Sequence, residues 1–284
     1  MAYRRGNPLI RRTPLFLATS KALTWLVELI GWPLMKAIYG YRASGKENLP
    51  RREASRRNAG NPRGRRPVIF VSNHALPLDP LLHALSILPR FTYFTLLEDT
   101  VLTPVLGTFV RLLGGIPIPP DSDRLDDIEA AVKAALDGRG RVHFYPEGEC
   151  FLLNQDIKPF KAGAFYYAIR HGAAVVPIVT LLKRRASRTT GGAEGPASAA
   201  TLSRPAQGSP ARRRPGRVRA EILILPARKP PAATGRASAD LHAAILFASQ
   251  TRAAMQAAID SGGGDKSLYL GPMPRIKGVN DRQR

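Results

Sequence analysis

The sequence predicts an α/β fold with a mostly parallel sheet flanked by helices. Across residues 67–260, short apolar runs alternate with longer segments of helical period. The run at 68–71 is apolar at every position, as in a strand that a parallel sheet buries on both faces. A hydrophobic content of 44% excludes global disorder. Cys150 is the only cysteine, which excludes a disulfide framework and a cysteine-based zinc site.

The expected strands and helices follow one another along this domain. Strands are expected at 68–71, 91–97, 116–118, 141–145, 174–180 and 218–225. Helices are expected at 80–88, 101–113, 122–136, 160–170 and 239–259. Asp121 or Ser122 can cap the third of these helices, and Gly138 ends it. Three consecutive glycines at 262–264 end the last one.

Residues 1–45 are predicted to form amphipathic helices that associate with a membrane. Charged residues interrupt the most lipophilic stretch, 15–39, which argues against a simple transmembrane span. A narrow polar stripe follows helical spacing: Lys21, Thr24, Glu28 and Gly31. Pro33 should kink or break the helix and leave a second short helix up to Tyr39. The alternatives are a helix packed on its own domain and a signal peptide.

The net charge of +22 is concentrated in three segments. Residues 1–21, 51–66 and 183–219 together carry +20, so the rest of the chain is nearly neutral. This distribution argues against a DNA-binding fold with a basic recognition surface. It favours basic segments that meet an anionic surface, although 33 of the 43 basic residues are arginine, which also fits a bias in composition. The expected organisation adds a basic loop at 46–66, a disordered basic insertion at 184–217 and a tail at 261–284.

Two polar clusters follow predicted strands, where sites form in open parallel sheets. In the first, His74 and Asp79 are five residues apart, and Pro77 between them favours a turn. A carboxylate that holds one ring nitrogen of a histidine leaves the other free to take a proton, so the pair is a candidate general base for a substrate hydroxyl. The alternative for Asp79 is a helix cap directly before Pro80.

The second cluster contains Glu147 and Gly148, which an ordinary turn would also explain. Lys158 and Lys161 follow at the start of the helix expected near residue 160, where ammonium groups and free N–H groups suit an anion. Two solvated lysines are the alternative. The other histidines are isolated and are interpreted as surface or packing residues: His83, His143, His171 and His242. Cys150 has no evident activating partner and is not proposed as a nucleophile.

Together, the clusters resemble the motifs of the glycerolipid acyltransferases, the lysophosphatidate acyltransferase superfamily. Residues 73–79 resemble its His-x4-Asp block, and 145–148 its Phe-Pro-Glu-Gly block. Further segments are similar to the remaining blocks in order and spacing: 114–118, 158–164 and 176–178. The resemblance covers roughly residues 65–182.

The resemblance implies a glycerolipid acyltransferase-like domain at the cytoplasmic face of a membrane. Such an enzyme moves an acyl group from a thioester of coenzyme A or acyl carrier protein to a glycerolipid or lysophospholipid hydroxyl. His74 would be the base, and Asp79 would orient it. The expected substrate-binding residues are Asn73, Arg124, Glu147, Gly148, Lys158 and Lys161. No metal or cofactor is expected beyond the thioester donor, and the expected partners are anionic membrane lipids.

Departures from the family pattern leave the acyl acceptor open. Glu149 and Cys150 stand where the family usually has Thr and Arg, and Pro120 stands where the second block usually ends in Arg. Two cations that would meet a phosphate are thereby lost and an acid is gained. An acceptor without a phosphate monoester is therefore an alternative to lysophosphatidate. A non-catalytic protein that binds membranes or nucleic acid is a further alternative, although the basic tracts lack the aromatics that stack on bases.

Overall fold

The structure is a computed structural model that describes residues 7–11, 13–50, 66–119, 124–185 and 218–274. Its strands are β1 (Arg42–Ser44), β2 (Val68–Ser72), β3 (Tyr93–Leu97), β4 (Gly115–Ile118), β5 (Arg141–Phe144), β6 (Phe151–Leu152), β7 (Ala174–Arg184), β8 (Val218–Ile224) and β9 (Gly271–Pro272). Its α-helices are α1 (Pro14–Tyr39), α2 (Asp79–Ser86), α3 (Glu98–Leu102), α4 (Leu106–Leu112), α5 (Leu125–Gly138), α6 (Gly163–Arg170) and α7 (Ala237–Gly262). Short 3-10 turns span Lys46–Asn48 and Lys266–Leu268.

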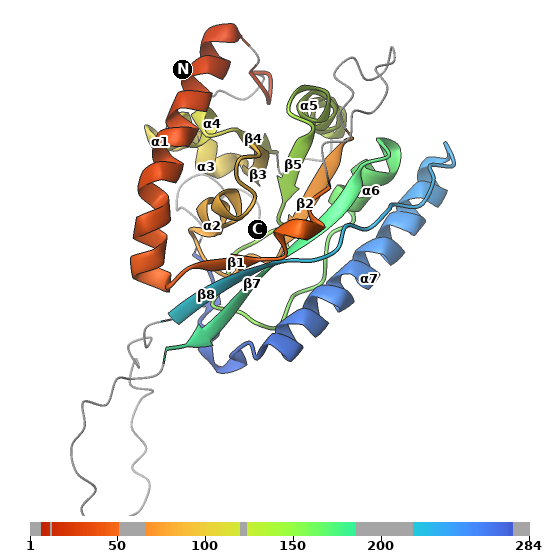
Figure 1. The fold of residues 1–284 in the computed structure, drawn as a ribbon. Coiled ribbons are helices and arrows are strands. Elements are labelled where there is room, and N and C mark those ends of the chain that lie inside the picture. The colour runs from red at the N-terminus through yellow and green to blue at the C-terminus, as the bar shows by residue number, and fades with distance from the viewer. Residues whose placement is uncertain (1–6, 12, 51–65, 120–123, 186–217, 275–284) are drawn as a thin grey trace, which may run out of the picture.

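A seven-stranded sheet in the order β1-β8-β7-β2-β5-β3-β4 forms the centre of the fold (Figure 1). The strands from β7 to β4 run parallel, which confirms the predicted mostly parallel sheet. β8 is antiparallel to β7, and β1 is parallel to β8. β1 lies in a segment for which only helices are predicted, so that part of the prediction is wrong: after α1 ends at Gly40, the chain extends along the sheet edge.

Helices cover both faces of the sheet, as the apolar run at 68–71 predicts. Val68 and Phe70 point into a core cluster that includes Met35 of α1 and residues of α2. Ile69 and Val71 point into the opposite cluster, to which α5, α6 and α7 contribute. Alternate side chains of β2 therefore enter different cores, and no position of this strand faces water.

α1 is one continuous helix, so the predicted break at Pro33 is wrong. Thr13 caps its first turn, and Gly40 ends it in the left-handed conformation. A proline inside a helix costs about 3 kcal/mol or more. Packing on both sides of Pro33 offsets this cost, because Met35 is fully buried and Gly31 lies against Leu81. A Cβ on Gly31 would come within 2.9 Å of the Leu81 side chain, so the glycine allows α1 to approach α2.

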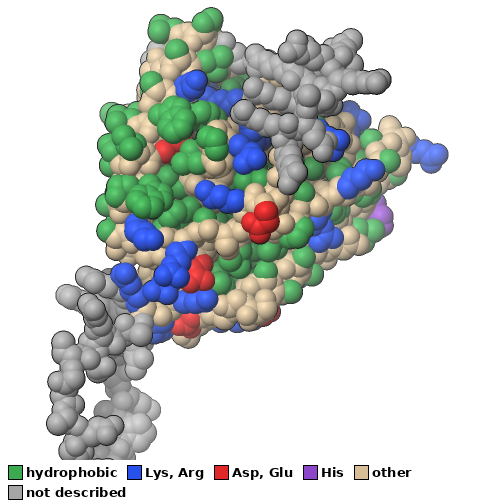
Figure 2. Space-filling model, viewed as in Figure 1, with side chains coloured by type: hydrophobic (Ala, Val, Ile, Leu, Met, Phe, Trp, Pro, Cys, Tyr) green, Lys and Arg blue, Asp and Glu red, His purple; other side chains and the backbone are tan. Residues whose placement is uncertain are grey.

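The predicted polar stripe of α1 partly faces the domain, and its apolar side chains face outward. Glu28 and Gly31 of the stripe are buried. Eight large apolar side chains of the helix are exposed: Leu15, Trp25, Leu26, Leu29, Ile30, Trp32, Leu34 and Ile38. Figure 2 shows hydrophobic side chains gathered over α1. By length and composition alone, the helix could cross a membrane.

Part of the predicted C-terminal tail packs on the domain. β9 pairs antiparallel with β6, and the Asp265 N–H donates to the Leu182 carbonyl at 2.9 Å. Most of the predicted basic loop and insertion, at 51–65 and 186–217, lies outside the described residues. The same holds for residues 275–284 and for the predicted cap at 121–122.

Candidate active site

The two polar clusters lie side by side at the carboxyl edge of the sheet. β2 and β5 are neighbouring parallel strands, and Val71 is paired with Phe144. The segments that follow these strands therefore leave the sheet at the same edge. The chain then returns through β6, whose Phe151 N–H donates to the His74 carbonyl at 2.9 Å. This arrangement brings residues 73–79 and 145–149 into one site.

His74 and Asp79 form the hydrogen-bonded pair expected from their spacing. Nδ1 of His74 lies 3.0 Å from Oδ2 of Asp79. An ionised carboxylate only accepts, so Nδ1 carries the proton that it donates. The other ring nitrogen, Nε2, has no hydrogen-bond partner among the described residues. The His74 side chain is 18% exposed, so it is reachable from the surface, whereas Asp79 is fully buried. The ring stacks on Tyr145, with the ring centroids 4.2 Å apart.

Asp79 lies at the start of α2, but it does not cap that helix. Its side chain makes no capping bond; instead, Oδ2 accepts from the backbone N–H groups of Ala75 and Leu76 at 2.7 and 2.8 Å. Oδ1 accepts from the Thr180 hydroxyl at 3.0 Å. Burial by itself raises the pKa of Asp79, but hydrogen bonds from His74 and Leu76 and the nearby imidazoles outweigh it, so the pKa is lowered. The carboxylate is therefore held in its ionised form.

Glu147 ties the first cluster to the segment that carries the lysines. Oε1 accepts from the His74 N–H at 2.9 Å, and Oε2 accepts from the Lys158 N–H at 3.0 Å. Burial raises the pKa of Glu147 to about 7. The two N–H donors favour the ionised form and lower the pKa, but burial outweighs them. Because both oxygens hold the backbone, the geometry gives this predicted substrate-binding residue a positioning role.

Asn73 also holds backbone rather than facing an open site. Its Oδ1 accepts from the Thr180 N–H at 2.8 Å, and its Nδ2 donates to the Thr180 carbonyl at 3.1 Å. The residue is 2% exposed. This amide pair fixes the end of β2 to β7 in register, so Asn73 supports the predicted site from behind.

The three predicted cations have different surroundings. Arg124 donates to Asp127 at 2.9 Å and lies 3.4 Å from the buried Glu98, so internal acids already balance its charge. Lys158 lies 5.4 Å from the Tyr269 ring centroid. Lys161 extends over Gly148: a Cβ there would lie 2.7 Å from the Lys161 Nζ. Among the described residues, Lys161 Nζ has no ion-pair or hydrogen-bond partner.

The lysines precede a helix rather than starting one. α6 begins at Gly163, so the prediction that it begins near residue 160 is wrong. The Lys161 N–H donates to the Pro146 carbonyl at 2.8 Å, which holds the segment beside the second cluster in a non-helical conformation. Gly148 has a φ of 79°, and together with the overlying Lys161 this favours glycine at the position.

Sequence reasoning missed a buried polar network behind the pair. His83 and His143, interpreted as isolated, are both fully buried and stack with their ring centroids 5.0 Å apart. They are joined through Ser72 and reach Thr180. The only available signal was the spacing from Asp79 to His83, which places both on one face of α2. Nothing in the sequence marks Thr180 or His143.

Cys150 is buried beside the site, as an inert thiol would be. It is 8% exposed, and burial raises its pKa to about 12. A thiol that stays protonated is a poor nucleophile. Among the described residues, no group of three or more His, Cys, Asp or Glu side chains is placed so that it could hold a metal ion.

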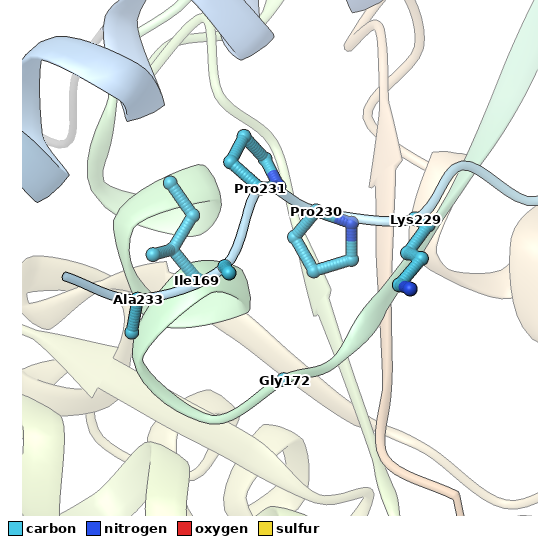
Figure 3. Close-up of a pocket in the computed structure, with 7 residues that line it drawn as sticks. Ile169, Gly172, Lys229, Pro230, Pro231 and Ala233 are labelled. Atoms are coloured by element: carbon cyan, nitrogen blue, oxygen red, sulfur yellow. The ribbon is translucent and has the colours of Figure 1, made fainter.

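A hollow of about 410 Å³ lies at the opposite edge of the sheet (Figure 3). Ile169 and Gly172, at the end of α6, line it together with residues 229–233. Gly172 precedes the start of β7, whereas His74 follows the end of the parallel strand β2. The hollow is therefore separate from the candidate active site.

The fold and the paired motifs define an α/β protein of the acyltransferase class. The chain belongs to the acyltransferase family, because the sequence model of that family, described as Acyltransferase, matches residues 40–181, half of the chain. This match confirms the resemblance noted from the motifs.

Individual proteins agree with this assignment. The chain is 29% identical over 141 residues to a chloroplastic 1-acyl-sn-glycerol-3-phosphate acyltransferase of Brassica napus, covering 48% of this chain and 36% of that protein. It is 28% identical over 147 residues to a chloroplastic one of Arabidopsis thaliana, covering 50% and 36%. The chain thus spans about a third of the length of these relatives. The fold is similar to the crystal structure of a 1-acyl-sn-glycerophosphate acyltransferase from Thermotoga maritima, with a TM-score of 0.54, 15% identity, and coverage of 87% of this chain and 82% of that one.

Proposed function

We propose that this protein is a membrane-associated O-acyltransferase that moves an acyl group from a coenzyme A or carrier-protein thioester to a hydroxyl of a glycerolipid or lysophospholipid. The observation that carries the proposal is the 3.0 Å bond between His74 Nδ1 and the buried Asp79, which leaves His74 Nε2 available at an accessible edge of the sheet. Family membership supplies the acyl-transfer chemistry.

In the proposed reaction, His74 Nε2 takes the proton of the acceptor hydroxyl as its oxygen attacks the thioester carbonyl carbon. A tetrahedral intermediate forms, the carbon–sulfur bond breaks, and the leaving sulfur receives the proton from His74. The products are an ester and a free thiol. The Asp79 carboxylate stabilises the imidazolium that exists between these two proton transfers.

α1 supports attachment to a membrane surface. Its outward side chains include two tryptophans, which suit the boundary between headgroups and acyl chains. Its last turn adjoins basic residues, since a Cβ on Gly40 would lie 3.6 and 3.7 Å from guanidinium nitrogens of Arg185 and Arg219. Figure 2 shows this basic area below the apolar one. We infer an anionic lipid surface as the partner.

The last turn of α1 lies within electrostatic range of Asp79, the partner of the proposed base. Burial raises the pKa of Tyr39, in the last turn of α1, and the Asp79 charge adds to this effect. An acceptor lipid that stays in the bilayer would therefore reach His74 from the side of the protein on which α1 binds the membrane surface. We propose that the enzyme works at the cytoplasmic face.

Polar replacement of the outer face of α1 is expected to weaken membrane binding. Leu29 and Ile30 are 74% and 58% exposed, so replacing both with glutamine leaves the core intact. Losing two apolar side chains from a lipid interface removes about 2 kcal/mol, or roughly 30-fold in the partition coefficient. Flotation with anionic vesicles measures the change.

The matched control is Leu241→Gln with Ile245→Gln, which alters an exposed apolar pair on α7, 46% and 52% exposed. Retained binding in this control, with loss in the α1 variant, supports the proposal. Equal behaviour of the two variants would contradict it.

We propose Lys161 as the cation that meets an acceptor phosphate. It lies over Gly148 and has no partner among the described residues, whereas Arg124 is neutralised by acids. Lys161→Gln should raise the KM for lysophosphatidate on the order of tenfold, through loss of one charge-assisted bond. The KM for monoacylglycerol should not change. Lys229→Gln, beside the distant hollow, is the control.

The alternative acceptor has no phosphate monoester, and the paired state of Arg124 and the presence of Glu149 favour it. An acyl-transfer assay decides between the two kinds of acceptor. Labelled acyl thioesters, on coenzyme A and on a carrier protein, are supplied to lysophosphatidate, lysophosphatidylglycerol and monoacylglycerol. Transfer to none of these acceptors would refute the proposed function.

A further inference from the structure

We propose that Thr180 and His83 are positioning residues, which hold Asp79 through a one-way chain of hydrogen bonds that begins at His143. The proposal rests on the function proposed above for His74 and Asp79. The chain is built on four elements that meet behind the site: β2, α2, β5 and β7.

The chain consists of four short contacts between buried side chains. His143 Nε2 lies 2.7 Å from the Ser72 hydroxyl, which lies 3.3 Å from His83 Nδ1. His83 Nε2 lies 2.8 Å from the Thr180 hydroxyl, which lies 3.0 Å from Asp79 Oδ1. Apart from Thr180 Oγ1, no partner for Asp79 Oδ1 occurs among the described residues.

The direction of the chain follows from its last acceptor. An ionised Asp79 accepts only, so the Thr180 hydroxyl donates to it. The Thr180 oxygen can then accept from His83, which must carry its proton on Nε2. His83 Nδ1 is left as an acceptor, for the hydroxyl of Ser72 or that of Tyr145 at 3.1 Å. When the Ser72 hydroxyl donates to His83 Nδ1, its oxygen accepts from His143 Nε2–H.

The unpaired ring nitrogen of His143 agrees with this direction of the hydrogen bonds. This direction leaves His143 Nδ1 without a proton, as a bare acceptor. This atom is buried and has no hydrogen-bond partner among the residues that the structure describes. A buried acceptor left alone is tolerated more readily than a buried N–H, which is rarely left without a partner. The reverse direction would bury an unpaired donor at the same place.

Both histidines in this series of hydrogen bonds, His83 and His143, are uncharged. Burial lowers the pKa values of His83 and His143 to about 3, so neither is protonated at neutral pH. The titratable groups within electrostatic range of Asp79 are His74 and Glu147 at the site, His83 on α2, Tyr39 on α1, and Tyr145 and Cys150 after β5. The Thr180 hydroxyl is therefore a neutral donor to the buried Asp79 carboxylate. Removing this hydroxyl would leave Asp79 Oδ1 without its donor.

The matched variants are Thr180→Val, which keeps the shape and removes the hydroxyl, and Thr180→Ser, which keeps the hydroxyl. The Thr180 backbone stays paired with Asn73 in both, so the strand remains in register. Thr180→Val should lower kcat on the order of tenfold with KM unchanged, because Thr180 is fully buried behind the site. The acid limb of its pH profile should move to higher pH, because Asp79 loses a donor to its ionised form. Thr180→Ser should restore both.

Wild-type kcat and acid limb in a folded Thr180→Val would overturn the proposal, as would a Thr180→Ser as slow as Thr180→Val. A second measurement does not depend on activity. Ring ¹⁵N spectra of the full chain in detergent should show His83 neutral and protonated on Nε2 at pH 7. His83 protonated on Nδ1 would refute the proposed series of hydrogen bonds, even if acyl transfer is intact. The expected tautomer without any acyl transfer would refute the proposed function instead.

Discussion

Replacing His74 with alanine is expected to lower kcat/KM for acyl transfer on the order of 100-fold or more, because it removes the proposed general base. The side chain is 18% exposed, and its ring supports no other hydrogen bond than that to Asp79 among the described residues. Folding should therefore survive. Initial rates with a labelled acyl thioester, at saturating acceptor, give the measurement, and circular dichroism checks the fold.

His242→Ala is the matched control, since His242 is an exposed histidine on α7. It should retain full activity. A His74→Ala variant that transfers acyl groups at the wild-type rate would show that another group removes the proton.

Replacing Asp79 with asparagine is expected to lower kcat by about 10²–10⁴-fold, as loss of an orienting carboxylate does in triad enzymes. The amide can keep an oxygen toward His74, Ala75 and Leu76, but the charge that stabilises the imidazolium is lost. In the opposite orientation, its NH₂ group would face three N–H donors. Substrate binding should change little, so the loss should appear in kcat rather than KM.

Asp137→Asn, on the surface of α5, is the control, because Asp137 pairs only with the exposed Lys133 among the described residues. The pH dependence of stability gives a second readout. The pKa of Asp79 is lowered below its usual 3.8, so its contribution is present above that value and is lost as the pH falls below it. Asp79→Asn should lack this component of acid unfolding. A variant with wild-type kcat would contradict the assigned role.

The sequence was sufficient for the parallel half of the sheet and for the hydrogen-bonded pair of His74 and Asp79. Both depend on local signals: an apolar strand, a turn, and residues five positions apart. β1 and the antiparallel β8 complete the sheet by long-range pairing, and three residues of β1 carry no local pattern. The break predicted at Pro33 does not occur, because packing on α2 holds α1 together across the proline.

The supporting residues of the site could not be predicted for the same reason. Asn73 and Glu147 stand in recognisable motifs, but their partners are the backbone groups of Thr180, His74 and Lys158. Asp79 precedes a proline at a helix start, which predicts a cap, yet its oxygens bind residues outside α2. The pairing of these donors and acceptors depends on how β7 packs beside β2. No short segment of the sequence predicts that packing.

We propose that the acyl group passes directly from a thioester to a lipid hydroxyl activated by His74. A single-turnover experiment with enzyme in excess over a labelled acyl thioester tests it most directly. We predict that the label moves to the lipid without appearing on the protein, and that thiol release requires the acceptor and is lost in His74→Ala. Label bound covalently to the protein, or thiol release that is independent of acceptor and His74, would contradict the account.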